Sequence, residues 1–160
     1  MTTTAFSPMS ELVTAFRAGL RSADPAGAVA RALAVRPPVL TGIPHDVSSH
    51  LLHAETELSL VALVWRPGRV TPVHDHLCWC VVHVVQGTVT ETRYRTQDVL
   101  ATTSVTRQRV GATTVLRPPD DIHRIANDTA DTAITLHVYG MDLRTGGSTR
   151  RRYADPAPLR

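Results

Sequence analysis

The stretch GRVTPVHDHLCWCVVHVVQG, from Gly68 to Gly87, decides the fold of this chain. It places His74 and His76 one residue apart. Side chains of a β-strand alternate between its two faces, so both imidazoles point one way and Asp75 points the other. Two imidazoles on one face begin a metal site. His123, in the distant turn-rich stretch RPPDDIHRIAN, is the candidate third ligand.

Short apolar runs separated by Gly, Pro, Asp and Asn follow residue 48. They predict strands at 58–65, 81–85, 88–94, 104–110, 113–116 and 132–139. The first of these runs, LSLVALVW, is apolar throughout, which predicts a strand buried on both faces. Together with the segment around the two histidines, the spacing indicates a sandwich or a closed β-barrel of about eight strands.

Residues 7–35 are predicted to be helical. Leu12, Phe16 and Leu20 recur at helical spacing. Asp24-Pro25 is a typical N-cap followed by proline at the first helical position, and it starts a second short helix. Pro37-Pro38 ends that helix.

The 160 residues, 42% of them hydrophobic, fit one globular domain over 1–160. We expect a helical segment at 1–47, a barrel at 48–140 and a C-terminal tail at 141–160 that packs on the barrel. No apolar run has membrane-spanning length and the N-terminus lacks the pattern of a signal peptide, so we expect a cytoplasmic protein without a membrane partner. Cys78 and Cys80 suit a reducing compartment.

The net charge is +3, and all 17 basic residues are arginine. The densest cluster is Arg150 to Arg152. Such a cluster either contacts nucleic acid or is a solvated strand or tail. No recognition motif accompanies it, so we expect no nucleic-acid partner.

Two motifs resemble those of the cupin family. The first is Gly68-x5-His74-x-His76-x3-Cys80-x6-Gly87, and the second is Pro118-x-Asp120-x2-His123-x3-Asn127. The resemblance implies an all-β, double-stranded β-helix (jelly-roll) barrel with short N-terminal α-helices in front of it. Many cupins carry a metal-binding Glu where this chain has Cys80. Three neutral ligands leave the ion its full charge and leave positions open for anionic ligands and dioxygen.

A cupin with three histidines and this cysteine is similar to the cysteine dioxygenase family, and VWRPGRVTPVHDHLCWCVVHVVQG is similar to its bacterial branch. The resemblance implies Fe(II) as the cofactor and oxidation of a small thiol to its sulfinate by dioxygen. The family's Ser-His-Tyr triad corresponds to Thr135, His137 and Tyr139. In some members the cysteine is cross-linked to the tyrosine, which makes Cys80 and Tyr139 the candidate thioether pair. A packed, unreactive Cys80 is the alternative.

Family members usually bind the substrate carboxylate with an arginine. Where the cysteine-type enzymes have it, this chain has Ser48-Ser49-His50. Members acting on 3-mercaptopropionate place an arginine shortly after the tyrosine, so the candidates here are Arg144, Arg150 and Arg151. The resemblance therefore implies cysteine or a related thiol acid such as 3-mercaptopropionate as the substrate.

Two other classes of function remain open. A zinc or nickel cupin with the same three histidines would catalyse isomerisation or hydrolysis without Tyr139. A cupin that binds a small ligand and regulates a partner would need no redox metal. The sequence is compatible with a monomer or a homodimer.

Overall fold

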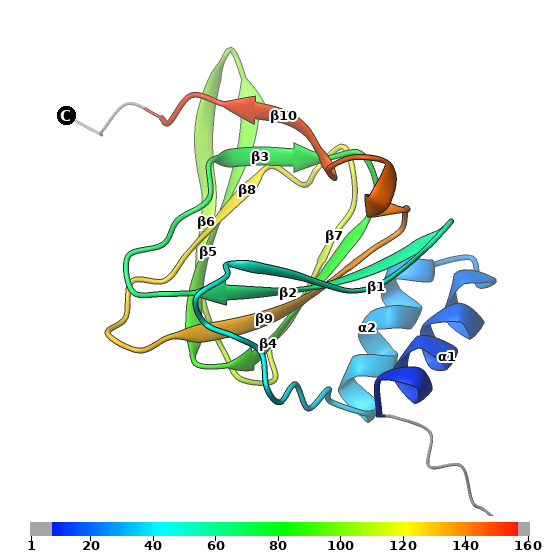
Figure 1. Ribbon diagram of the computed structural model, residues 1–160. Coiled ribbons are helices and arrows are strands. Elements are labelled where there is room, and N and C mark those ends of the chain that lie inside the picture. The colour runs from blue at the N-terminus through cyan, green and yellow to red at the C-terminus, as the bar shows by residue number, and fades with distance from the viewer. Residues whose placement is uncertain (1–7, 157–160) are drawn as a thin grey trace, which may run out of the picture.

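The computed structural model describes residues 8–156 and contains two facing antiparallel β-sheets with two helices on the outside of one of them (Figure 1). The first sheet has the order β1 (Ser49–Glu55), β2 (Leu58–Trp65), β9 (Ala133–Tyr139), β4 (Cys80–Gln86), β7 (Thr113–Leu116). The second has the order β10 (Thr149–Tyr153), β3 (Val73–His76), β8 (His123–Ala126), β5 (Thr88–Gln97), β6 (Val99–Arg109). The predicted all-β barrel with short N-terminal helices is confirmed.

The helices α1 (Pro8–Leu20) and α2 (Pro25–Val35) pack against the outer face of the first sheet. The Asp24 side chain accepts a hydrogen bond from the Gly27 backbone N–H, as expected for an N-cap. Phe16 on α1 is fully buried in the cluster that these helices form with Leu60 of β2 and Leu136 of β9. No helix within residues 8–156 is long and apolar enough to cross a membrane.

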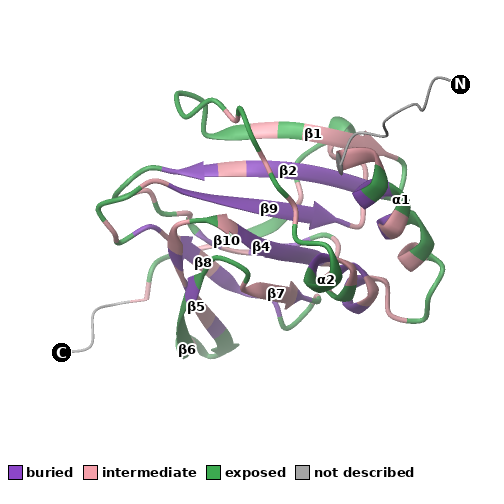
Figure 2. Ribbon diagram, turned by 90° about the horizontal axis from the view of Figure 1, so that it is seen from below, coloured by how far each residue is buried: buried purple, intermediate pink, exposed green. Residues whose placement is uncertain are grey.

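The central strands of the first sheet, β2, β9 and β4, are almost entirely buried on both faces (Figure 2). One face packs on the helices, while the other forms the barrel interior with Val89 and Ile125 of the second sheet. This explains why Leu58–Trp65 is apolar without alternation, and the prediction of a strand buried on both faces is confirmed.

The segment after Tyr139 contains more regular structure than the predicted tail. A short 3₁₀ helix, η1 (Leu143–Thr145), leads into β10, which pairs with β3. Thr149 lies opposite His76 and Tyr153 lies opposite Val73. Backbone hydrogen bonds make this pairing, so an arginine-rich sequence can form it although its side chains are mostly exposed.

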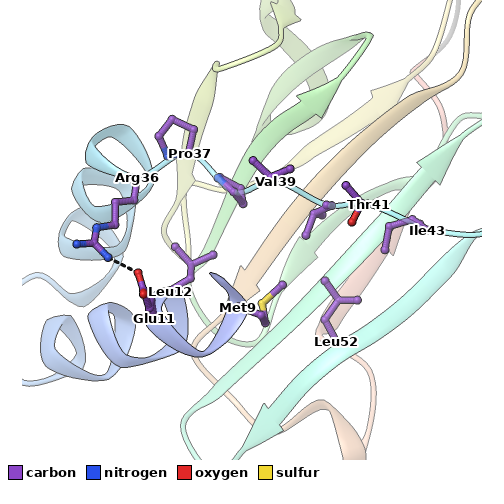
Figure 3. Close-up of a pocket in the computed structure, with 11 residues that line it drawn as sticks. Met9, Glu11, Leu12, Arg36, Pro37, Val39, Thr41, Ile43 and Leu52 are labelled. Atoms are coloured by element: carbon purple, nitrogen blue, oxygen red, sulfur yellow. Dashed lines mark hydrogen bonds and ion pairs between the residues drawn. The ribbon is translucent and has the colours of Figure 1, made fainter. Parts of the chain in front are cut away.

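An apolar groove of about 450 Å³ lies between α1, the segment after α2 and β1 (Figure 3). Met9, Leu12, Leu40 and Leu52 contribute to its walls. It does not include the three candidate histidines, which lie in the barrel between the sheets.

Candidate metal centre

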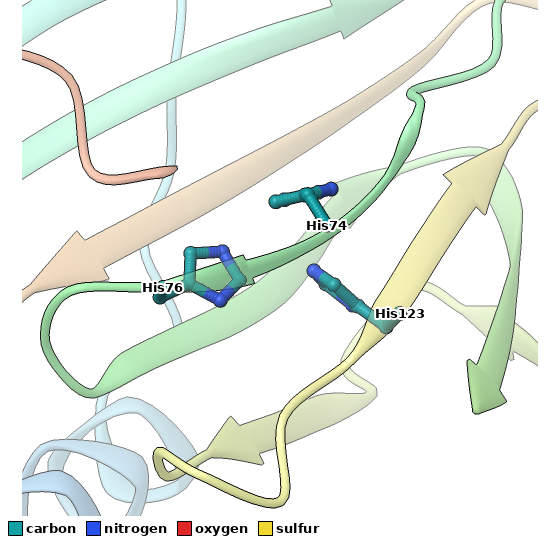
Figure 4. A group of neighbouring side chains, drawn as sticks. All are labelled: His74, His76 and His123. Carbon is teal, nitrogen blue, oxygen red and sulfur yellow. The ribbon is translucent and has the colours of Figure 1, made fainter. Parts of the chain in front are cut away.

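The structure brings His74, His76 and His123 together. The three rings come from β3 and the start of β8 and lie side by side (Figure 4). The candidate ligand atoms all lie within 4.8 Å of one another. His74 and His123 are opposite each other in the register of the two strands, so the pairing of β3 with β8 is what joins distant parts of the sequence.

Each ring is held by its Nδ1. His74 Nδ1 donates to the Pro72 carbonyl, His76 Nδ1 donates to Asp121 Oδ2, and His123 Nδ1 donates to Glu91 Oε1, all at 2.9 Å. Carbonyl and carboxylate oxygens only accept, so Nδ1 carries the proton in all three rings. The lone pair of each neutral imidazole is then on Nε2. Anchoring one ring nitrogen so that the other is free for a metal is typical of metal-binding histidines.

Two buried carboxylates therefore flank the cluster. Burial acts to raise the pKa of Glu91, but the hydrogen bond with His123 and favourable electrostatic interactions with His123 and Arg93 outweigh it, and the net pKa is lowered. Asp121 behaves in the same way, because burial is outweighed by its side-chain and backbone hydrogen bonds with His76. Two ionised carboxylates behind neutral imidazoles make these nitrogens stronger donors to a cation.

Burial lowers the pKa of His74 to about 4, with a smaller contribution from the neighbouring His123. Burial also lowers the pKa of His123. These two imidazoles are thus neutral at physiological pH, the form that binds metal. Three neutral nitrogen donors with a carboxylate behind two of them suit a borderline divalent cation such as ferrous iron or zinc.

Cys80 and Tyr139 share the barrel interior with this cluster. They are directly opposite each other on β4 and β9, and both belong to the same buried cluster. Burial raises the pKa of the Cys80 thiol well above its usual range. Burial, with Cys80 as the next cause, does the same to the Tyr139 hydroxyl. The Tyr139 ring centroid lies 6.3 Å from that of His76.

Thr135, His137 and Tyr139 point into the same interior from alternate positions of β9. Thr135 Oγ1 lies 2.8 Å from His137 Nε2, and His137 Nδ1 lies 3.4 Å from the Tyr139 hydroxyl. All three side chains are buried. Because these residues are two apart along the strand, their side chains share one face and form a continuous series of polar contacts.

The candidate substrate arginines have other partners. Arg144 pairs with Asp142, with 2.7 Å between Nη2 and Oδ2. Arg151 Nε lies 3.4 Å from Asp75 Oδ2, and Asp75 points away from the face of β3 that carries the histidines. Arg150 is exposed at a bulge in β10. A role for these arginines in carboxylate binding stays a prediction.

Sequence reasoning missed the two supporting carboxylates. It singled out Asp120, which is exposed, whereas the adjacent Asp121 is buried and holds His76. Glu91 occupies an inward-facing position of β5. A charged residue at an inward position of an alternating strand was the available signal, but its partner comes from another strand and is not visible in the sequence.

Comparison with known proteins agrees with this geometry. The family model for cysteine dioxygenase type I matches residues 48–152, a range that contains all three histidines, Cys80 and Tyr139. None of the strands of the two sheets begins before residue 48.

Solved structures have the same fold. One is a conserved protein with a double-stranded β-helix domain from Klebsiella pneumoniae, with 16% identity over 72% of this chain and 90% of its own, and a TM-score of 0.50. Another is the cupin domain of Schizosaccharomyces pombe Cnp3, with 13% identity over 69% of this chain and 72% of its own, and a TM-score of 0.52. At these identities the likeness concerns the fold alone.

Proposed function

Because this chain belongs to the cysteine dioxygenase type I family, we propose that it is an Fe(II)-dependent dioxygenase that oxidises a small thiol to its sulfinate. In the net reaction, R–SH and O₂ give R–SO₂H, so both oxygen atoms are transferred to sulfur. The observation that carries the proposal is the convergence of His74, His76 and His123 within a chain of this family.

Ferrous iron held by these rings would supply the redox chemistry that allows dioxygen to react with a thiol. The protein's own part is to hold three neutral donors in place through Pro72, Asp121 and Glu91. The surrounding apolar side chains, such as Val82 and Leu116, exclude water from the interior and strengthen the electrostatic interactions there. The substrate class is a small thiol acid, cysteine or a relative such as 3-mercaptopropionate.

Tyr139 is the candidate hydrogen-bond donor of the site. Its pKa is raised by burial, so the hydroxyl keeps its proton at physiological pH. A protonated phenol inside the barrel can donate a hydrogen bond to an anionic group of the substrate or to developing negative charge on oxygen. His137 and Thr135 would orient this hydroxyl.

An oxygen electrode tests the proposal. Iron-loaded protein is mixed with cysteine, 3-mercaptopropionate and cysteamine, and mass spectrometry follows the sulfinate. We expect one dioxygen consumed per sulfinate formed with one of these thiols. His74→Ala should abolish uptake, whereas His45→Ala, which alters an exposed histidine, should not. Zinc or nickel in the natively purified protein, with no oxygen uptake after iron loading, would favour the isomerase or hydrolase alternative.

A further inference from the structure

Trp65 of β2 adds one more residue to the series of hydrogen-bonded side chains on β9. Its indole Nε1 donates to Thr135 Oγ1 across 2.7 Å, and both side chains are fully buried. Thr135 Oγ1 in turn contacts His137 Nε2. The chain therefore runs from Trp65 through Thr135 and His137 to Tyr139, and its first member is the one whose hydrogen-bonding role is fixed by chemistry.

An indole N–H can only donate, so the direction of every later bond follows from it. Thr135 uses a lone pair for Trp65 and has its own proton available for His137 Nε2. A nitrogen that accepts this proton is itself unprotonated. His137 is neutral, since burial and the neighbouring His123 lower its pKa well below the usual range. Its single ring proton is then on Nδ1, the nitrogen that faces the Tyr139 hydroxyl.

Tyr139 consequently accepts from His137, and its own proton is directed to a different partner. The side chains of Cys80 and Ser148 lie within hydrogen-bonding reach of that hydroxyl. If these hydrogen bonds had the opposite direction, the Tyr139 hydroxyl would donate its hydrogen bond to His137. The direction of the chain therefore decides whether Tyr139 is a donor or an acceptor toward the interior of the site.

The surroundings of Trp65 hold the indole in this orientation. The guanidinium carbon of Arg69 lies 4.7 Å from the centre of the ring, a distance typical of a cation–π contact. Arg69 is itself fixed by hydrogen bonds to the carbonyls of Ser48, at 2.9 Å, and Val64. Asn127 Nδ2 donates to the Trp65 carbonyl at 2.7 Å. Contacts to the ring and to the backbone of Trp65 thus hold the indole donor in place.

We propose that Trp65 is a positioning residue that fixes His137 in its Nδ1–H tautomer and thereby leaves the Tyr139 proton free for a partner other than His137. The effect on turnover rests on the proposed thiol dioxygenase function. The tautomer of His137 is independent of that function, because it is a property of the metal-free protein.

Nitrogen-15 NMR of the histidine rings in metal-free protein tests the proposal. We expect the Nδ1–H form for His137 in the unchanged chain; the Nε2–H form would overturn the proposal. Trp65→Phe removes the donor but keeps an aromatic ring. It should shift the tautomer ratio toward Nε2–H by about fivefold, the size expected for loss of one neutral hydrogen bond. An unchanged ratio in folded Trp65→Phe would also overturn it.

Two further variants make the test specific. Trp79→Phe removes the other indole of the chain and should leave the ratio unchanged. Thr135→Val removes the hydroxyl with little change in volume and should reduce the Nδ1–H form, whereas Thr135→Ser should retain it. Thr135→Val tests only the contact between Thr135 and His137, so if Trp65→Phe does not fold, Trp65→Leu, which also removes the indole donor, is measured in its place. In the iron-loaded enzyme, Trp65→Phe should lower kcat more than it changes KM.

These results separate the two proposals. If the His137 tautomer depends on Trp65 but the protein oxidises no thiol, the proposed function is wrong and the proposed role of Trp65 is retained. If the protein oxidises a thiol but His137 is in the Nε2–H form, the proposed function is retained and the proposed role of Trp65 is wrong.

Discussion

Cys80 and Tyr139 occupy directly opposite positions on the antiparallel strands β4 and β9, with both side chains inside the barrel. Directly opposite side chains on one face are close enough for contact, and the thiol and the phenol interact here. Neither group ionises readily, because burial raises both pKa values. We therefore expect oxidative coupling of the pair by an oxidant such as dioxygen rather than acid–base chemistry.

We expect a thioether between Cys80 and Tyr139 after aerobic incubation of the iron-loaded protein. Coupling removes one hydrogen atom from each group, so intact mass spectrometry should show a loss of two hydrogen atoms. Cys80→Ala should abolish the loss. Cys78→Ala should retain it, and a mass deficit that survives in Cys80→Ala would contradict the assignment.

Removal of one histidine should remove the metal. His123 is the candidate ligand from β8, and we expect the two remaining donors on β3 to be too few for a stable site. His123→Ala should reduce the metal content from about one ion per chain to near zero. His45→Ala is the control. Metal should also raise the melting temperature of the unchanged protein and leave that of His123→Ala where it was.

The carboxylate behind His123 should contribute to metal affinity. Glu91→Gln keeps the size of the side chain and an oxygen acceptor but removes the charge. Loss of such a partner typically costs 10–100-fold in metal affinity, and we expect a decrease of that size in a competition titration. Glu57→Gln removes an exposed charge and should have no effect. Equal affinity in the two variants would mean that Glu91 only fills space.

The metal-free protein should lose stability on acidification. The pKa of His74 is about 4 in the fold and 6.5 in its unperturbed state, so between these values the unfolded chain binds more protons. The free energy of unfolding should therefore fall as the pH falls from about 6.5 to about 4. Urea unfolding at several pH values, with a chelator present, measures this free energy. His74→Gln should flatten this dependence, and an unchanged slope would exclude His74 as its source.

The helices should contribute to stability independently of the site. Phe16 of α1 is fully buried against the first sheet, and Phe16→Ala should cost about 3–5 kcal/mol of the free energy of unfolding. Val35→Ala, at a position that is 80% exposed, should change it little. Urea unfolding gives both values. Metal affinity of the folded Phe16→Ala protein should match that of the unchanged chain.

Local patterns in the sequence predicted much of this molecule. The bounds of β2 agree with its apolar run, because a strand buried on both faces has a continuous apolar sequence, and the bounds of β7 agree with the strand predicted at 113–116. Asp24-Pro25 identified the start of α2 for an equally local reason, since a cap acts within its own turn. The two histidines of β3 were recognisable because alternation along one strand places both on one face.

Features that depend on distant partners were not predicted. β1 is a partly exposed edge strand and lacks a clear apolar pattern. β10, with the sequence TRRRY, resembles a solvated tail because its strand pairing is made by the backbone and most of its side chains are exposed. Asp121 acquires its role only when β8 comes together with β3, and Glu91 only when β8 comes together with β5. No spacing along the sequence encodes these contacts.

The strand that carries His74 and His76 is short, and it lies between β8 on one side and β10 on the other. Asp75, between the two histidines, accepts hydrogen bonds from the backbone of Arg151 and the hydroxyl of Tyr153. During synthesis on the ribosome, these residues leave the exit tunnel long after the histidines do. We therefore expect metal acquisition to be a late event in the maturation of the newly made chain, and a nascent chain stalled before Arg151 should bind metal poorly.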